Sequence, residues 1–364
     1  MSLVQLSSAR AVFVCGSGGV GKTSVSAALA LHIARNGRRV LVITIDPARR
    51  LASAIGLRAT GNEVVEVPFS GLVDGSVHMS MLDTKQGWDA LVARHAPDAA
   101  TREKVLANNL YRNITERFVN SHDYIAIERL WEVMKSGEYD TVVVDTPPSR
   151  NAIGVLDAPQ RMRDFFASKL LRWLTVPASS RLVGVASKPF FALADRVLGA
   201  RFLSDVAEFF ALFRKMEPAF VAHAIEVEAL LGAPDTAYAV VTTPEPAPVA
   251  EAKYLEQALT SRGHPTAVMV VNRAMGADLR KLIPQASDFL ASSPEDPAFV
   301  GRVRTAVDAM AVAIDQQDAQ IAQLQSTQRE TVVLPEFLGA IHDLEGIRFL
   351  ADDLGQTFGH GNSR

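Results

Sequence analysis

The sequence predicts an α/β protein built on a doubly wound, mostly parallel β-sheet. Short apolar runs, which are typical of strands, alternate along the chain with Ala- and Leu-rich stretches, which are typical of helices. Several runs consist almost entirely of Val, Ile and Leu, as expected for parallel strands that are covered on both faces. The predicted strands are residues 11–15, 40–45, 77–82, 141–144, 237–242, 266–271 and 331–334. Ligands bind such sheets at the carboxyl ends of the strands, so we expect a site at that edge.

The composition is that of an ordinary globular protein. Of the 364 residues, 48% are hydrophobic and 21% are charged, and the net charge of −3 gives no general attraction to nucleic acid or anionic membranes. No apolar run is long enough for a membrane span and residues 1–10 do not resemble a signal peptide, so we expect a cytoplasmic protein. The single cysteine, Cys15, excludes an internal disulfide and a Cys-x-x-Cys zinc site, and we expect it to be buried.

We predict one domain over residues 1–364, with two helical additions to the sheet. The first is a helical insertion at residues 86–136, and the second is an aromatic-rich helical subdomain at residues 160–231. Nine of the 17 phenylalanines lie in the second addition, and the spacing of Phe209 and Phe213 places them on one helical face. Two interpretations stay open: these side chains form a packed core, or they present a face to an apolar client or partner.

A glycine-rich loop joins the first predicted strand to the helix that follows it. Residues 16–24 satisfy the pattern G-x-x-x-x-G-K-[ST] of phosphate-binding P-loops. Glycines let the backbone wrap closely around phosphate oxygens, and the N–H groups at the start of the helix attract the anion. The predicted phosphate-binding residues are Gly16, Ser17, Gly18, Gly19, Val20, Gly21, Lys22, Thr23 and Ser24.

Three side chains of this loop have expected roles in binding a nucleoside triphosphate. Lys22 would reach the β- and γ-phosphates as a point charge, and Thr23 would place its hydroxyl on Mg²⁺. Ser24 would bond the α-phosphate from the first helical turn. Because phosphoryl transfer depends on positioning and on the neutralisation of charge, Lys22 is also a predicted catalytic residue.

Two aspartates that follow apolar strands would complete the site. Asp145 ends the predicted strand 141–144 in the manner of a Walker-B carboxylate, which holds Mg²⁺ through a coordinated water. Asp46 follows another predicted strand and precedes Pro47, which disfavours helix there; we expect Asp46 to orient the attacking water and to face Mg²⁺ through water. The alternative for Asp46 is an N-cap of the next helix. The loop at residues 146–150 either senses the γ-phosphate or is a plain connection.

The base of the nucleotide is predicted to be adenine. The tetrapeptide Asn-Lys-x-Asp, which GTPases of this class usually carry after a late strand, does not occur in the sequence. Instead, Asn272 follows the predicted strand 266–271, and its amide both donates and accepts hydrogen bonds, which matches the edge of adenine. We therefore expect ATP rather than GTP.

Together these motifs resemble the ArsA-type ATPases, a family that includes arsenite-pump ATPases, ATPases that escort tail-anchored membrane proteins, and bacterial anion-transporting ATPases. The resemblance covers most of residues 11–355, with the motifs in the order and spacing of the family. It rests on the P-loop and on Asp46-Pro47-Ala48, Asp145-Thr146-Pro147-Pro148, Thr243-Pro244-Glu245 and Val271-Asn272.

The resemblance implies a P-loop NTPase fold of the deviant Walker-A branch, ATP hydrolysis with Mg²⁺, and dimers in which the nucleotides face each other. By analogy, Asp46 orients the attacking water and Asp145 serves Mg²⁺. Asn272 would read adenine, and Pro335 lies where the family closes the adenine pocket. The resemblance further implies a nucleotide-driven switch of the dimer that handles a protein client or a membrane partner.

The sequence departs from the family pattern at three points, which narrow the function and the assembly that the resemblance implies. Ser17 stands where the deviant P-loop normally has a lysine that reaches into the partner's site, and a hydroxyl cannot neutralise phosphate. The paired cysteines that bind zinc between subunits of the tail-anchor targeting members are missing, so we expect no zinc. Cys15 alone cannot supply the several soft thiolates that a metalloid pump needs.

Ser17 leads to a prediction about assembly. We expect a homodimer, or a heterodimer with a paralogue that carries the missing lysine, with a hydrophobic protein as a candidate client and no nucleic acid. Two other functions stay open: a nucleotide-gated binding module with little turnover, and a partition-type ATPase. The acidic segment 343–358 argues against the DNA-binding surface or basic membrane tail that a partition ATPase needs.

Overall fold

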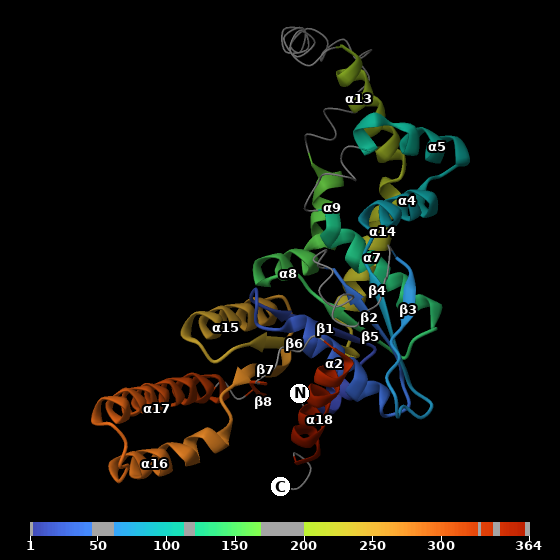
Figure 1. Ribbon diagram of the computed structural model, residues 1–364. Helices are drawn as coiled ribbons and strands as arrows, with labels where there is room; N and C mark the ends of the chain where they lie inside the picture. The colour runs from blue at the N-terminus through green and yellow to red at the C-terminus, as the bar shows by residue number, and fades with distance from the viewer. Residues whose placement is uncertain are drawn as a thin grey trace.

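A β-sheet forms the centre of the computed structural model (Figure 1). The structure describes residues 3–45, 62–112, 121–168, 200–326, 329–337 and 343–360. In these residues the sheet has eight strands in the order β3-β4-β2-β5-β1-β6-β7-β8. The strands are β1 (Ala11–Gly16), β2 (Arg39–Thr44), β3 (Val64–Glu66), β4 (Ser76–Met81), β5 (Thr141–Asp145), β6 (Thr236–Thr242), β7 (Thr266–Ala274) and β8 (Thr331–Pro335). All neighbours pair in parallel except β3 and β4, which confirms the predicted α/β class.

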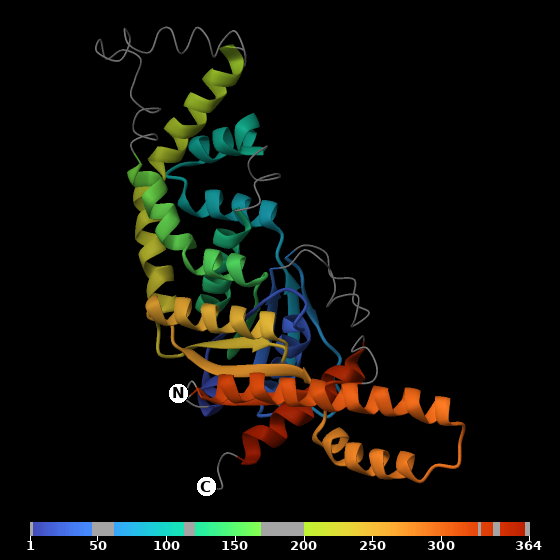
Figure 2. The same ribbon diagram turned by 90° about the vertical axis from the view of Figure 1, so that its left-hand side faces the viewer.

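Helices cover both faces of this sheet (Figures 1 and 2). On one face, α2 and α18 pack against the strands, and on the other face α7, α8 and α15 do so. The described helices are α1 (Leu3–Ser8), α2 (Lys22–Ala34), α4 (Thr84–His95), α5 (Ala99–Ala107), α7 (Ser121–Ser136), α8 (Ser149–Leu156), α9 (Ala158–Ala167), α13 (Ala200–Lys215), α14 (Glu217–Leu231), α15 (Pro246–Ser261), α16 (Ala277–Ala291), α17 (Pro297–Gln325) and α18 (Leu344–His360). Because both faces are covered, the central strands are buried along their length, which accounts for their Val- and Ile-rich sequences.

Every strand predicted from the sequence is present, with bounds that differ by one to three residues at an end. β3 and α1 are not among the elements predicted from the sequence. β3 has three residues, too few to show the period-two pattern of a strand, and it pairs with β4 at the edge of the sheet. α1 has six residues, which is less than two helical turns and too short for a helical period.

Cys15 lies at the end of β1, directly before the P-loop. The residue is fully buried, as the sequence predicts. Burial raises the pKa of its thiol to about 12, so the thiol stays protonated at neutral pH. Since the thiolate is the reactive form of cysteine, the thiol is held in its unreactive form.

Six helices stand together above one end of the sheet, and we call them the helical region: α4, α5, α7, α9, α13 and α14 (Figures 1 and 2). Their apolar side chains form a third core that is separate from the two layers on the sheet. Residues 113–120 and 169–199 lie outside the described residues, and so do Trp173, Phe190 and Phe191. The division of the chain into a sheet domain and additions at 86–136 and 160–231 stays a prediction.

Four phenylalanines of the predicted aromatic-rich segment pack against one another in the helical region. The ring centroid of Phe213 lies 5.3 Å from the centroids of Phe166, Phe209 and Phe220. Each of these four side chains is at most 5% exposed, whereas Phe165 beside them is 37% exposed. Within the described part of the segment, these four aromatic side chains therefore belong to a packed core.

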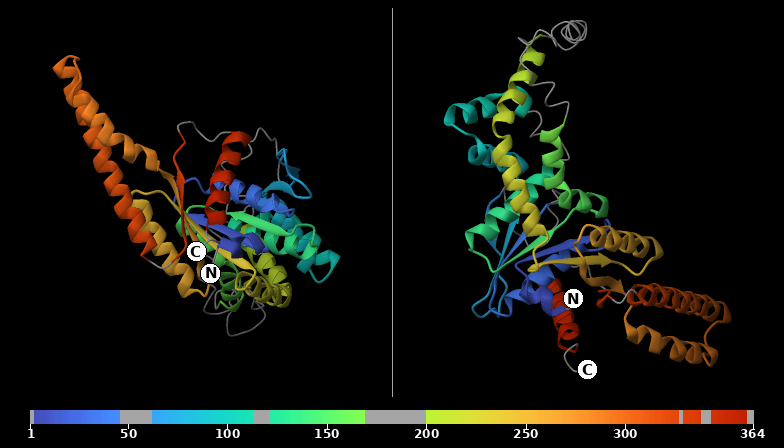
Figure 3. Two further views of the ribbon diagram at one scale, coloured as in Figure 1. Left: turned by 90° about the horizontal axis from the view of Figure 1, so that it is seen from below. Right: turned by 180° about the vertical axis from the view of Figure 1, so that it is seen from behind.

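α16 and α17 form a helical hairpin that extends away from the sheet (Figure 3). α17 is 29 residues long, and most of its side chains are exposed or half-buried. Among the residues that the structure describes, no helix combines the length and the apolar character that crossing a bilayer requires.

Candidate nucleotide-binding site

The register of the central strands brings the predicted site residues to one edge of the sheet. Asp145 at the end of β5 lies opposite Val14 of β1 on one side and opposite Thr44 of β2 on the other. β1 then runs into the P-loop and α2, and β2 runs toward residue 46. The P-loop and Asp145 therefore share the carboxyl edge, where ligands bind in sheets of this type.

The P-loop needs glycine at two positions for steric reasons. A Cβ at Gly16 would lie 2.2 Å from the carbonyl oxygen of Val241 on β6, so only glycine allows this close approach. Gly21 is the N-cap of α2 and has φ 90°, in the left-handed region that other residues avoid. A Cβ at Gly21 would also lie 2.4 Å from Nδ2 of Asn272. The loop is thus fixed from β6 and from β7.

Lys22 begins α2, and its side chain bends back over the loop. The side chain is buried, with 8% of its surface exposed, and Nζ donates a hydrogen bond to the carbonyl oxygen of Ser17 at 2.8 Å. This places an ammonium group on the P-loop, at the N-terminus of α2. A buried cation beside a helix N-terminus is an electrostatic site for phosphate.

Thr23 and Asp145 meet next to this lysine. Oγ1 of Thr23 donates a hydrogen bond to Oδ2 of Asp145 at 2.7 Å, and Asp145 is 1% exposed. The pair joins the start of α2 to the end of β5, so two residues that are each expected to serve Mg²⁺ lie side by side. A hydroxyl and a carboxylate are the hard oxygen ligands that Mg²⁺ prefers, so the residues present fit that ion.

The loop after Asp145 is held close to the P-loop. Oγ1 of Thr146 donates a hydrogen bond to the carbonyl oxygen of Val14 at 2.8 Å, which fixes the exit of β5. Pro148 lies beside the P-loop, because a Cβ added at Gly18 would be 4.0 Å from Cγ of Pro148. This position is compatible with either interpretation of the loop, a phosphate sensor or a plain connection.

Asn272 contacts the P-loop from a strand that is not adjacent to β1. Its Nδ2 donates a hydrogen bond to the carbonyl oxygen of Val20 at 2.9 Å, and the residue is 3% exposed. The sequence predicts Asn272 at this edge but gives no sign of this supporting bond. Pro335 lies at the end of β8, in register with Ala274 of β7, so both predicted adenine-pocket residues end neighbouring strands.

Asp46 lies outside the described residues. The last described residue of that segment is Ile45, which is 5% exposed. Ser24 lies in the first turn of α2 and is half-buried. The predicted roles of Asp46 and Ser24 stay predictions.

Ser17 occupies a buried position in the loop. The residue is 8% exposed, and within the described residues its Oγ has no hydrogen-bond partner. A buried hydroxyl without a partner costs free energy, so this position favours a ligand or subunit that supplies one. The second position of the P-loop is thus neutral, and its polar atom is available.

We expect Gly21→Ala to weaken ATP binding by at least about 10-fold, which corresponds to about 1.4 kcal/mol. The added Cβ would push against Nδ2 of Asn272 and break the bond from Asn272 to Val20. Titration with a fluorescent ATP analogue measures the effect. Gly37→Ala is the matched control, because Gly37 also has a positive φ, 78°, but a Cβ there meets nothing within 4 Å. Equal ATP affinity in the two variants would contradict the proposed support of the loop.

Comparison with known proteins agrees with this geometry. Residues 9–282 match the family of anion-transporting ATPases. The uncharacterised protein SCO2128 of Streptomyces coelicolor is 28% identical over 270 residues, which are 74% of this chain and 63% of that protein. ATPase get3 of Aspergillus terreus is 26% identical over 203 residues, which are 55% of this chain and 54% of that protein. ATPase GET3 of Pyricularia oryzae is 27% identical over 163 residues, which are 43% of this chain and 46% of that protein.

The chain therefore spans less than two thirds of the length of each of these relatives. The family match is broader than the matches to the two fungal proteins: it runs from before β1 to within α16 and contains the P-loop, Asp145 and Asn272. On the strength of this match, which covers well over half of its residues, the chain belongs to the family of anion-transporting ATPases.

Proposed function

We propose that this protein is a cytoplasmic, Mg²⁺-dependent ATPase. The observation that carries the proposal is the contact between Thr23 and Asp145 next to the buried ammonium of Lys22. The hydroxyl–carboxylate pair suits Mg²⁺, and the lysine with the N-terminus of α2 suits the phosphates. Membership of the anion-transporting ATPase family and the two relatives named as ATPases support ATP as the substrate.

The proposed mechanism gives each residue one task. Lys22 neutralises charge on the β- and γ-phosphates, and Thr23 and Asp145 hold the metal ion, the aspartate through water. When bound, Mg²⁺ supplies further neutralisation of the same phosphates. Asp46 orients the water that attacks the γ-phosphate.

The adenine pocket is proposed at the ends of β7 and β8. Asn272 has an amide carbonyl besides the N–H group that it gives to Val20, and the carbonyl oxygen accepts hydrogen bonds as the amino group of adenine requires. Pro335 would cover the base from the next strand. Both residues are on the same edge as the P-loop.

We further infer that two subunits face each other across their nucleotides and switch conformation with binding and hydrolysis. The buried, neutral Ser17 supports a heterodimer with a paralogue whose P-loop carries a lysine, and a homodimer is the alternative. The helical region is the proposed element that moves against a hydrophobic protein client or a membrane partner, because α7 and α14 lead directly into the strands on either side of β1.

A second candidate function is a nucleotide-gated binding module with little turnover. Ser17 favours it, since a hydroxyl stabilises developing charge on phosphate less than an ammonium does. The presence of Lys22, Asp46 and Asp145 opposes it, because together they would supply the charge, the oriented water and the metal contact that hydrolysis requires.

Steady-state ATPase rates of the wild type, Asp46→Asn and Ser17→Lys separate these functions. For the ATPase we expect Asp46→Asn to lower turnover by about 100-fold while ATP still binds, because the attacking water loses its orienting carboxylate. Equal rates for the wild type and Asp46→Asn would instead support the binding module. A higher ATPase rate for Ser17→Lys than for the wild type supports the idea that the P-loop lacks a positive charge at this position.

Native mass measurement of the complex from its own cells tests the assembly of the subunits. A fully active homodimer would exclude the heterodimer.

A further inference from the structure

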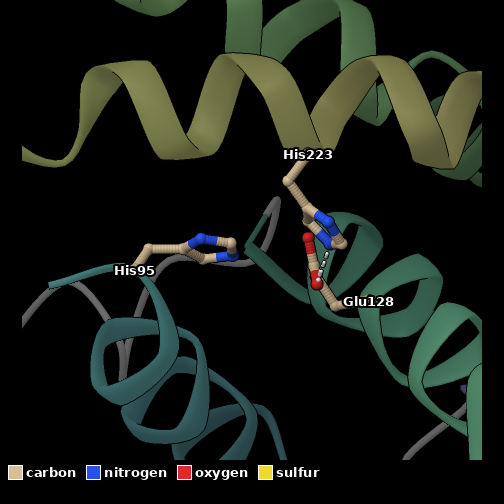
Figure 4. Close-up of side chains that lie close together, drawn as sticks. All are labelled: His95, Glu128 and His223. Atoms are coloured by element: carbon tan, nitrogen blue, oxygen red, sulfur yellow. Dashed lines mark hydrogen bonds and ion pairs between the residues drawn. The ribbon is translucent and has the colours of Figure 1, made fainter.

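Two histidines and a glutamate converge inside the helical region, away from the nucleotide site. His95 is the last residue of α4, Glu128 lies in α7 and His223 lies in α14. One ligand atom from each of them lies within 4.8 Å of the other two. Figure 4 shows the ring of His95 directed toward the other two side chains, which are joined by a contact of 2.7 Å between Nε2 of His223 and Oε2 of Glu128.

Glu128 and His223 are buried and His95 is half-buried, and one polar atom of the cluster has no partner. Glu128 and His223 are each 5% exposed. Within the described residues, Nε2 of His95 is buried and has no hydrogen-bond partner, whereas the carboxylate of Glu128 also faces the hydroxyl of Tyr124. Buried polar atoms are nearly always satisfied in native proteins, so an imidazole nitrogen that has no partner beside a carboxylate and a second imidazole calls for a ligand.

Aromatic side chains hold the two imidazoles in place. The ring of Trp131 meets His223 edge-on with centroids 4.3 Å apart, and the ring of Phe220 lies 4.9 Å from that of His95. The two imidazole centroids are 5.0 Å apart. Side chains that are fixed by packing lose little freedom when they bind a ligand, which is the condition for a preorganised site.

The charges around Glu128 allow it to take a cation. Nη1 of Arg94 lies 3.3 Å from Oε2 of Glu128, and the other amino group of Arg94 bonds Glu132, one turn further along α7. Glu132 also pairs with Arg129 at 3.2 Å. Arg94 therefore has a second carboxylate to which it can remain bound when Glu128 turns to a metal ion.

We propose that His95, Glu128 and His223 form a binding site for a divalent transition-metal ion of the Zn²⁺ type. Two imidazoles and one carboxylate are a common ligand set for Zn²⁺, with water in the fourth position, whereas Mg²⁺ and Ca²⁺ prefer oxygen ligands only. The three ligand atoms lie within 4.8 Å of one another, and metal bonds of about 2.0–2.2 Å require them to move closer together.

The site revises the expectation of no zinc, which considered thiolate ligands alone. It also has a consequence for the fold: α7 leads into β5 with Asp145, and α14 leads into β6 beside the P-loop strand β1. A metal ion that joins α4, α7 and α14 would fix the helical region on the two strands that flank the P-loop strand. Binding of the metal does not depend on ATP hydrolysis, so this inference stands or fails separately from the proposed function.

The test is a titration of tag-free, metal-stripped full-length protein with Co²⁺, which is monitored by visible absorption. Zn²⁺ is then added to displace the bound Co²⁺. We expect one equivalent to bind in the presence of excess Mg²⁺. His95→Gln and His223→Gln should each lower the affinity by more than about 100-fold, since loss of a direct ligand exceeds the 10–100-fold cost of losing a supporting contact. Glu132→Gln is the matched control for Glu128→Gln. Both carboxylates bond Arg94, but only Glu128 contacts a histidine of the cluster. The metal affinity of the Glu132→Gln variant should therefore stay within about 3-fold of wild type.

The proposal is overturned if wild type binds no stoichiometric Co²⁺ or Zn²⁺, or if both histidine variants bind as tightly as wild type. Circular dichroism reports whether the variants fold. If a histidine variant does not fold, X-ray absorption of the wild-type protein with bound Co²⁺ replaces the measurement on that variant. Scattering from two imidazoles supports the proposed site, and absence of this scattering overturns the proposal.

Discussion

Replacing Lys22 with alanine is expected to lower ATP turnover by about 1,000-fold. Removal of one preorganised donor to a developing negative charge typically costs 10²–10³-fold, and in P-loop enzymes this lysine acts on the phosphates that carry the charge. Lys22 is 8% exposed and is already bonded to the loop at Ser17, so its ammonium is held in place before substrate arrives. Turnover measured at saturating ATP reports the catalytic loss, and titration with a fluorescent ATP analogue reports the loss of binding.

Lys281→Ala is the control for this prediction. Lys281 is also a lysine in the first turns of a helix, but its side chain is 75% exposed and it pairs only with Asp278, three residues earlier, among the contacts of the described residues. We expect its turnover to match wild type, because exposed pairs of this type contribute at most about 1 kcal/mol to stability and lie far from the site. If Lys22→Ala keeps more than about a tenth of the wild-type turnover, then Lys22 is not the charge that stabilises the reaction.

Sequence patterns predict the sheet because burial on both faces leaves a strong local signal. The strand that ends at Asp145 is an unbroken apolar run, and its position after a P-loop is sufficient to place it near Thr23. The order of strands is not local information. The hydrogen bond from Asn272 to Val20 depends on β7 lying next to β6 and on the position of the P-loop after β1. Neither can be obtained from the sequence around residue 272.

The cluster of His95, Glu128 and His223 shows the same limit more strongly. The three residues come from three helices, and no two of them have the short spacing along the chain by which metal ligands are recognised in sequences. Only the packing of α4, α7 and α14 brings them together. The proposed metal site therefore leaves no signal in the sequence, where cysteines are the more recognisable zinc ligands.

The aromatic-rich segment allows two interpretations from sequence, and Phe213→Ala distinguishes them. We expect this variant to be less stable than wild type by about 3–5 kcal/mol, the usual cost of truncating a buried phenylalanine. Phe213 is 5% exposed and packs against Phe166, Phe209 and Phe220, so its removal leaves a cavity at the centre of the helical region. Urea unfolding followed by circular dichroism measures the loss, which should appear as an earlier transition of the helical region.

Phe289→Ala on α16 is the control for Phe213→Ala, because it removes an exposed phenylalanine ring instead of a buried one. Phe289 is 71% exposed, so its truncation should change the free energy of unfolding by at most about 0.5 kcal/mol. If Phe213→Ala is as stable as Phe289→Ala, the ring of Phe213 is not part of a packed core, and the segment is better described as a surface for an apolar client. If it is destabilised as expected, a client must be received by another part of the helical region, because binding at these four rings would require the core itself to open.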